Sequence, residues 1–405
     1  MPAIRASEWR KLPLSLSELC IETTLRCGQS FRWRKVNDEW NCVLHGRLLS
    51  LKQDPDFLHY KVTWPKLASI SPKAAVLCKE ETQSDVPKDT DDTEGLLRHY
   101  FSLRHDLTAL YDQWSKSDPN FRKKAPKFTG IRILSQDAWE ALIGFICSSN
   151  NNISRISQMV YKLCIHYGPF VAHVDGEPFH DFPTPQALAG KKVEAHLREL
   201  GFGYRAKYIA ETARLVTEEK PEGWLESLAN PENPAWGISV KVEDEEPPTY
   251  QRAHEQLLLL SGVGPKVADC VCLMGLGWGE AVPVDTHVWQ IAQRDYSFGK
   301  TKSKTFSKAM YDSVGDHFRK IWGPQAGWAQ SVLFTANLKT FSEQLAGKTE
   351  SVAVIKGEVA DQVSVTPDSK RRKRQISAVV EPADIKDNVS LGIRSSSRKR
   401  TTARG

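Results

Sequence analysis

The sequence predicts an α+β fold in which an N-terminal antiparallel β-rich domain packs on an all-helical domain. Residues 15–65 contain short stretches of alternating polar and aromatic residues, which is typical of half-buried strands. From residue 137 onward, apolar residues recur at helical spacing. The chain has 405 residues, and because a domain usually contains roughly 150 residues, we expect more than one hydrophobic core. We expect residues 1–126 to form the β-rich domain, 127–346 the helical domain and 347–405 a disordered basic tail.

The strand signal in the first domain is clearest around a predicted turn. Residues 30–34 (Ser-Phe-Arg-Trp-Arg) alternate polar with aromatic side chains. Asn37 and Asp38 are typical turn residues, and the strand pattern resumes at residues 40–43. The pattern therefore predicts two antiparallel strands joined by a short turn. Residues 78–94 are polar and acidic and are predicted to form a loop.

The second domain is predicted to begin with two helices joined by a polar connection. Asp137 is a predicted N-cap, and a second helical run starts at Ile153 and ends near Gly168. Residues 148–152 (Ser-Ser-Asn-Asn-Asn) lie between them. Residues 230–248 are rich in proline and acidic residues and are predicted to form an insertion loop. Further helices are expected at residues 191–200, 204–216, 251–260, 265–274, 286–294, 303–318 and 327–337.

The positive charge of the chain is concentrated in the tail. Residues 366–405 contain eleven Lys and Arg against four Asp and Glu, a net charge of +7. The whole chain carries +6, so the other 365 residues together carry −1. Net charge alone is therefore weak evidence for a nucleic-acid partner. Two basic clusters, residues 370–374 and 398–400, are compatible with nuclear import or loose DNA contact, or with a solvated tail of no specific use. We expect a nuclear protein and leave a mitochondrial share open.

Cysteine spacing and hydropathy argue against a metal site and a membrane span. None of the eight cysteines forms a C-x-x-C motif, and Cys270 and Cys272, the closest pair, have no further His or Cys at ligand spacing. We therefore expect no metal and no cofactor. The longest aliphatic run, residues 257–260, is far too short to cross a membrane, and we expect a soluble intracellular protein without a membrane partner.

A hairpin with two glycines is expected to join the helices at residues 251–260 and 265–274. Gly262 and Gly264 can take positive φ and let the backbone approach a neighbour closely. Pro265 suits a first helical turn, so the exposed N–H groups there could hold a DNA phosphate. By itself, the pattern also fits an ordinary turn between two helices.

The helix after this hairpin carries a candidate nucleophile. Lys266, Cys270 and Met274 recur every four residues and therefore lie on one face. A lysine partly removed from water loses its proton more easily and could act as a nucleophile, whereas the alternative is a lysine that extends to water beside core residues. Asp285 follows Lys266 by nineteen residues and precedes a helical pattern. It is a predicted N-cap, and it could also stabilise positive charge on a sugar ring.

These residues resemble the helix-hairpin-helix DNA glycosylase superfamily, in which a glycine-containing hairpin is followed by an aspartate. A lysine at the position of Lys266 marks members with an additional lyase step. The iron–sulfur cysteine loop of the endonuclease III and adenine-mismatch branches is absent after Asp285. Four further stretches, residues 27–33, 145–155, 201–205 and 327–334, resemble eukaryotic 8-oxoguanine DNA glycosylases. The resemblance covers about residues 13–338 and implies a TBP-like β-rich domain beside a helix-hairpin-helix glycosylase domain.

The resemblance implies a role for each matching residue. Lys266 would attack the anomeric carbon and form a Schiff base, while Asp285 would stabilise the sugar cation. The base pocket would consist of Gly28, Cys270, Met274, Gln330 and Phe334. In this pocket the Gly28 carbonyl would accept a hydrogen bond from a ring N–H that 8-oxoguanine has and guanine lacks. Contacts to DNA would come from Asn150, Arg155, Tyr204, Arg205, Gly262, Gly264 and His287. Asn150 would fill the gap left by the flipped base, Arg155 and Arg205 would read the unpaired cytosine, Tyr204 would wedge the opposite strand, and His287 would contact a phosphate.

The resemblance thus predicts a monomer that acts on double-stranded DNA with 8-oxoguanine opposite cytosine. Two alternatives remain open at this point. The chain could be a related glycosylase for alkylated or ring-opened purines, or a catalytically inactive DNA-binding protein that keeps the hairpin as a phosphate clamp. Gly28, Gln330 and Phe334 favour 8-oxoguanine over simple alkylation, and the presence of both Lys266 and Asp285 argues against the inactive protein.

Overall fold

The computed structural model describes residues 5–65, 91–238, 247–299 and 307–341. All of them belong to one compact unit, Met1–Ser351. The predicted tail, its two basic clusters and most of the predicted loop at residues 78–94 lie outside the described residues. Within the described ranges, no helix combines the length and the apolar character needed to cross a membrane.

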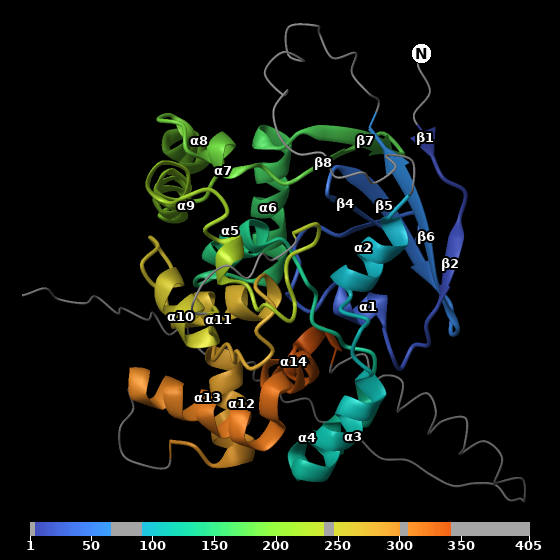
Figure 1. Ribbon diagram of the computed structural model, residues 1–405, viewed down its shortest axis with the longest axis vertical. Helices are drawn as coiled ribbons and strands as arrows, with labels where there is room; N and C mark the ends of the chain where they lie inside the picture. Colours follow the sequence, from blue (N-terminus) through green and yellow to red (C-terminus); the bar gives the residue numbers. More distant parts are fainter. Residues whose placement is uncertain (1–4, 66–90, 239–246, 300–306, 342–405) are drawn as a thin grey trace, which may run out of the picture. The chain divides into compact units, whose positions relative to one another are not determined.

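The N-terminal part is a six-stranded antiparallel sheet, as the sequence predicts (Figure 1). The strands run in the order β1-β6-β5-β4-β3, and β2 also pairs with β6. Asn37 and Asp38 have φ of 50° and 60°, the geometry of a two-residue hairpin turn, so the predicted turn is confirmed. The strands are β1 Arg5–Ala6, β2 Arg10–Pro13, β3 Arg34–Val36, β4 Glu39–Leu44, β5 Arg47–Gln53 and β6 Phe57–Trp64.

The predicted strand at residues 30–34 is wrong except at its last residue, because β3 begins at Arg34. The alternating pattern has a different cause. Phe31 packs in the core of the helical part and Trp33 in the core beneath the sheet, so successive aromatic residues face two different cores. Between them, buried Arg32 pairs with Asp181 at 3.1 Å. The segment therefore joins the two cores.

Short helices complete the core of the sheet. Helix α2 (Thr93–Tyr100) contributes Leu96, Leu97 and Tyr100 to this core, and the Tyr100 hydroxyl accepts a hydrogen bond from Trp33 Nε1 at 2.9 Å. Helix α1 (Ile21–Thr24) packs against the same core.

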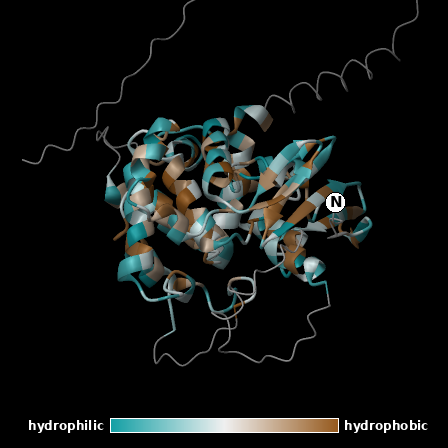
Figure 2. Ribbon diagram, turned by 90° about the horizontal axis from the view of Figure 1, so that it is seen from above, coloured by the Kyte–Doolittle hydropathy of each residue, from teal (hydrophilic) through white to brown (hydrophobic). Residues whose placement is uncertain are grey.

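The remaining helices share a second, larger core. Figure 2, coloured by hydropathy, shows hydrophobic and hydrophilic residues alternating along these helices. These helices are α3 Leu107–Ser117, α4 Pro119–Lys124, α5 Ala138–Ser148, α6 Ile153–Tyr167, α7 Pro185–Leu188, α8 Val193–Glu199, α9 Arg205–Arg214, α10 Tyr250–Leu257, α11 Pro265–Met274, α12 Thr286–Tyr296, α13 Lys308–Trp322 and α14 Ala326–Asn337. Every helix predicted within the described residues is present, with shifted ends at several positions. Asp137 caps α5 by accepting from Glu140 N at 2.8 Å, as predicted.

Two features of this part were not expected from the sequence. Helices α3 and α4 lie before the predicted boundary at residue 126, yet their buried side chains belong to the helical core. Strands β7 (Phe170–Val174) and β8 (Glu177–His180) form a hairpin whose turn, Asp175-Gly176, is itself a recognisable Asp-Gly signal. The division at residues 126 and 127 stays a prediction.

The described part of the predicted insertion, residues 230–238 and 247–248, makes defined contacts. Trp236 packs against His99 of α2, with ring centroids 5.6 Å apart. Asn230 N donates to Leu276 O at 2.8 Å, in the loop that follows α11. Arg104 donates to the Glu232 carbonyl. The segment therefore connects α2 of the sheet part to the loop at the end of α11.

Candidate active site

The hairpin before α11 uses its two glycines differently. Gly262 has φ of 77°, and a Cβ there would lie 2.5 Å from the Tyr208 ring, so the position needs glycine. Gly264 has φ of −101°, so only Gly262 uses the positive φ that either glycine could adopt. It is the N-cap residue before Pro265, and a following proline favours extended backbone. Nothing lies within 4 Å of a Cβ at Gly264, so the first turn of α11 stays open to a phosphate.

Helix α11 places Lys266, Cys270 and Met274 along the wall of one cavity, as predicted. Lys266 Nζ lies 5.0 Å from the centre of the Phe145 ring and donates to Ser148 Oγ at 3.1 Å. Burial raises the pKa of the Cys270 thiol to about 11, so that side chain stays neutral. The lysine is therefore held between an aromatic ring and a hydroxyl at the mouth of the cavity.

Asp285 is the N-cap of α12, as predicted. Its Oδ1 accepts a hydrogen bond from Val288 N at 2.9 Å. The carboxylate thus lies at the N-terminal end of α12. Asp285 and Lys266 line the same cavity.

The predicted base-pocket residues Gly28, Cys270, Met274, Gln330 and Phe334 line this cavity together. Its volume is about 50 Å³, which holds only a few water molecules. Phe334 packs edge-on against His287, with ring centroids 5.7 Å apart. A cavity of this volume is too small for a purine base as it stands.

A larger cleft of about 740 Å³ adjoins this small cavity. Lys266 and Asp285 line both spaces, so the candidate nucleophile stands where a nucleotide would pass from the cleft into the pocket. Asn150, Gly264 and His287 face the cleft, as the predicted DNA contacts require.

The predicted cytosine-reading residues lie around one strained turn. Asn150 has φ of 46° and is exposed. Arg205 is 3% exposed and donates through Nη2 to the carbonyls of Asn150, at 3.0 Å, and Ser149. Tyr204, which is 46% exposed, also donates to Ser149 O, at 3.0 Å. Arg155 is exposed on the first turn of α6. The structure thus leaves Arg155 open to solvent, whereas the Arg205 guanidinium already holds the turn.

Sequence reasoning missed two residues that contact the candidate nucleophile, Lys266. Phe145 and Ser148 lie on the last turn of α5, and Ser148 Oγ also donates to Phe145 O at 2.7 Å. Because the hydroxyl proton of Ser148 is donated to Phe145 O, its oxygen is left to accept a hydrogen bond from Lys266 Nζ. No local signal marks a serine before an asparagine run as the partner of a lysine 118 residues away.

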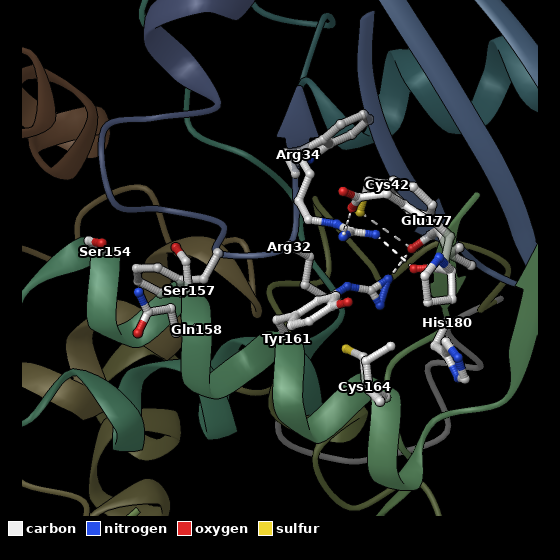
Figure 3. Close-up of a pocket in the computed structure, with 16 residues that line it drawn as sticks. Arg32, Arg34, Cys42, Ser154, Ser157, Gln158, Tyr161, Cys164, Glu177 and His180 are labelled. Atoms are coloured by element: carbon white, nitrogen blue, oxygen red, sulfur yellow. Dashed lines mark hydrogen bonds and ion pairs between the residues drawn. The ribbon is translucent and has the colours of Figure 1, made fainter. Parts of the chain in front are cut away.

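A separate cavity of about 510 Å³ lies between α6, the segment at residues 31–34 and the β7-β8 hairpin (Figure 3). Its charged groups are paired with one another. Arg34 pairs with Glu177 at 2.7 Å and lies 4.0 Å from the centre of the Phe179 ring. Arg32 is buried and paired with Asp181. Among the described residues, no cluster of three or more His, Cys, Asp or Glu side chains fits a metal ion. The cavity beside Lys266 is therefore the better candidate for chemistry.

Comparison with known families agrees with this geometry. Residues 143–312 match the model of the HhH-GPD superfamily of base excision DNA repair proteins. The fold and the site thus define a helix-hairpin-helix DNA glycosylase. Residues 11–142 match the N-terminal domain of 8-oxoguanine DNA glycosylase.

Two curated relatives narrow the class. The N-glycosylase/DNA lyase of Saccharomyces cerevisiae is 39% identical over 81% of this chain and 86% of its own length. The N-glycosylase/DNA lyase OGG1 of Arabidopsis thaliana is 36% identical over 86% of this chain and 87% of its own length. This chain belongs to the 8-oxoguanine DNA glycosylase family of N-glycosylase/DNA lyases. The predicted enzyme class and the predicted family are confirmed.

A solved structure of the Clostridium acetobutylicum 8-oxoguanine glycosylase/lyase shares the fold. The TM-score is 0.60 at 24% identity, over 82% of this chain and 96% of that chain. The predicted α+β class, with an antiparallel sheet beside a helix-hairpin-helix domain, is thereby confirmed.

Proposed function

We propose that this enzyme removes 8-oxoguanine paired with cytosine from duplex DNA and then cleaves the strand by β-elimination through Lys266. The observation that carries the proposal is the position of Lys266, which lines both the small cavity and the larger cleft together with Asp285. The names of the relatives support the two activities. The Clostridium enzyme in the solved complex is bound to double-stranded DNA containing cytosine opposite 8-oxoguanine.

The chemistry follows from the two side chains. Lys266 Nζ forms a bond to C1′ of the sugar, the bond from C1′ to the base breaks, and the base leaves with the electron pair and takes up a proton. The Asp285 carboxylate stabilises the positive charge that develops on the sugar. Opening of the sugar ring gives an iminium between Lys266 and C1′. Loss of a proton from C2′ then expels the 3′ phosphate and cuts the strand.

The small cavity supplies lesion recognition once it widens to admit the base. Gln330 and Phe334 are four residues apart on α14, so an amide reads the pairing edge while a ring stacks on the base. Cys270 packs the opposite side of the base. The Gly28 carbonyl accepts the ring N–H of the lesion. Breaking the contact between Phe334 and His287 frees His287 for a phosphate.

The opposite strand is read at the turn that carries Asn150. Arg155 and Arg205 offer guanidinium donors to the acceptor edge of cytosine, while Tyr204 wedges the strand. Arg205 must first release the carbonyls of Ser149 and Asn150. Recognition of cytosine is thus coupled to release of the turn that fills the duplex gap.

A cleavage assay tests the proposal against the alternatives left open by the sequence. Duplexes that contain 8-oxoguanine or an alkylated purine are incubated with excess enzyme, with and without borohydride. We expect cleavage and a trapped adduct on the 8-oxoguanine duplex, and neither with Lys266→Gln. Lys308→Gln is a matched control, because Lys308 lines the same cleft but is 73% exposed and pairs with Asp312. An adduct formed by Lys266→Gln would refute the assignment, and preferred cleavage of the alkylated duplex would change the substrate.

The nuclear location and the monomeric state are also proposals. They are supported by the basic clusters at residues 370–374 and 398–400 and by a site built from one chain. Deletion of residues 366–405 should reduce nuclear accumulation and low-salt binding to undamaged DNA, with lesion excision kept. Loss of excision in the truncated protein would show instead that the tail is part of the enzyme.

A further inference from the structure

Two buried glutamine side chains lie between the turn that carries Gly28 and the helix that carries Lys266. Gln29 is 3% exposed and Gln136 is 6% exposed. Buried amides are costly unless their donors and acceptors are paired. Their hydrogen bonds therefore show what the two side chains hold in place.

Gln29 uses both ends of its amide group. Its Nε2 donates to Arg132 O at 2.8 Å, and its Oε1 accepts from Leu134 N at 3.0 Å. The side chain thus pairs with the backbone of residues 132–134 much as a neighbouring strand would. The residue after Gly28 is fixed to a segment more than 100 residues away in the chain.

Gln136 extends this connection to the opposite wall of the cavity. Its Nε2 donates to Gln29 O at 3.1 Å, and its backbone N donates to Met274 O at 2.7 Å. Met274 is the last residue of α11 and lines the cavity. One residue therefore connects the Gly28 turn, through its side chain, to the end of α11, through its backbone.

Gly28 needs such external support. Its φ is 84°, and a Cβ there would approach Ile153 Cδ1 to 3.0 Å. Without a Cβ, the peptide plane between Gly28 and Gln29 rotates more freely than at any other residue type. Across the described ranges, Gly28 takes part in none of the backbone hydrogen bonds of turns and loops. A directional acceptor at this position must be oriented by its neighbours.

We propose that Gln29 and Gln136 are specificity-determining positioning residues that orient the Gly28 carbonyl toward the ring N–H of 8-oxoguanine. With Gln29 fixed at its side chain and at its carbonyl, its Cα is held in place, which limits rotation of the peptide plane that precedes it. Guanine has a bare acceptor at the same ring nitrogen and is repelled by the oriented carbonyl. This inference rests on the proposed function. Strand cleavage at an abasic site needs Lys266 but no base reader, so it does not depend on the two amides.

The test compares binding to lesion and undamaged DNA. Gln136→Leu is made in the Lys266→Gln background, and dissociation constants are measured for duplexes with 8-oxoguanine or guanine opposite cytosine. We expect the preference for the lesion, measured as the dissociation constant for guanine divided by that for 8-oxoguanine, to fall about tenfold. The lesion would lose an aligned hydrogen-bond acceptor, and guanine would no longer be repelled by the oriented carbonyl. The matched control is Asn41→Leu. Asn41 is a fully buried amide of β4 whose Oδ1 accepts from Ser50 at 2.6 Å, and its loss should leave the ratio unchanged.

Two further measurements separate positioning from general damage. With Lys266 intact, Gln136→Leu should cleave a preformed abasic site within twofold of the unmodified rate. In Gln136→Glu, a protonated carboxyl can still donate to Gln29 O and a carboxylate cannot, so selectivity should fall as pH rises; this variant serves if the leucine variant does not fold. An unchanged ratio in Gln136→Leu, or an equal fall in Asn41→Leu, would overturn the inference while leaving the proposed function intact. If the unmodified protein showed no preference for 8-oxoguanine, the proposed function would fail first.

Discussion

Substitution of the two hairpin glycines by alanine should separate stability from DNA binding. Gly262 has φ of 77°, a region that costs an alanine about 1–2 kcal/mol. The new Cβ would also lie 2.5 Å from ring atoms and 2.7 Å from Cβ of Tyr208. That Cβ is attached to the backbone of α9 and cannot swing away, so overpacking adds about 1–3 kcal/mol.

The free energy of unfolding should therefore fall by about 2–5 kcal/mol in Gly262→Ala. A change of this size lowers Tm by roughly 5–15 °C for a domain of this kind. Gly264→Ala is the matched control, because Gly264 has an ordinary φ and open space around a Cβ. It should change stability by less than about 0.5 kcal/mol. Because Gly264 faces the cleft, the same variant should weaken DNA binding at low salt.

Thermal and urea denaturation give the stabilities, and fluorescence anisotropy with a duplex gives the affinities. Equal Tm values for Gly262→Ala and the unmodified protein would refute the steric argument. A loss of stability in Gly264→Ala as large as in Gly262→Ala would show that the hairpin responds to any side chain rather than to this geometry.

Three further predictions concern Arg155, Ser148 and Glu140. Arg155→Ala should lower the ratio of the single-turnover excision rate opposite cytosine to that opposite adenine about tenfold. The rate of cleavage at an abasic site should fall by a smaller factor. Equal excision rates opposite cytosine and adenine in the unmodified enzyme would remove the basis for this role. Ser148→Ala should lower the rate of base excision about tenfold at unchanged affinity for an abasic-site analogue, because Lys266 Nζ loses its acceptor at 3.1 Å; Ser148→Thr should restore activity, and a lack of rescue would argue against a hydroxyl role. Burial raises the pKa of Glu140 from its usual 4.5 to about 7, so the folded state binds the proton more tightly than the unfolded chain. Stability should therefore fall, on the order of 1–3 kcal/mol, as pH rises from about 4.5 to 7, and urea midpoints for Glu140→Gln should lack most of this slope.

Much of the local structure could be predicted from short patterns because its causes act within a few residues. Asp137 and Asp285 cap helices that follow them directly, and the predicted helix at residues 265–274 is present with the same ends. The four-residue spacing of Lys266, Cys270 and Met274 is enough to place them on one face of that helix. The alternating pattern around Arg32 led to a wrong strand prediction, because a local pattern cannot distinguish a strand from a segment that joins two cores.

The sequence by itself thus determined the family, the helices around the hairpin and the identity of the candidate catalytic pair. Only the tertiary structure decided that Arg205 is buried against the turn of Asn150, and that the Phe334 ring packs edge-on against His287 beside the small cavity. It also decided that Gln29 and Gln136 connect the two walls of that pocket. Each of these arrangements joins residues far apart in the chain. A single sequence carries no local signal for such contacts, because they depend on how buried polar groups find partners after the cores have formed.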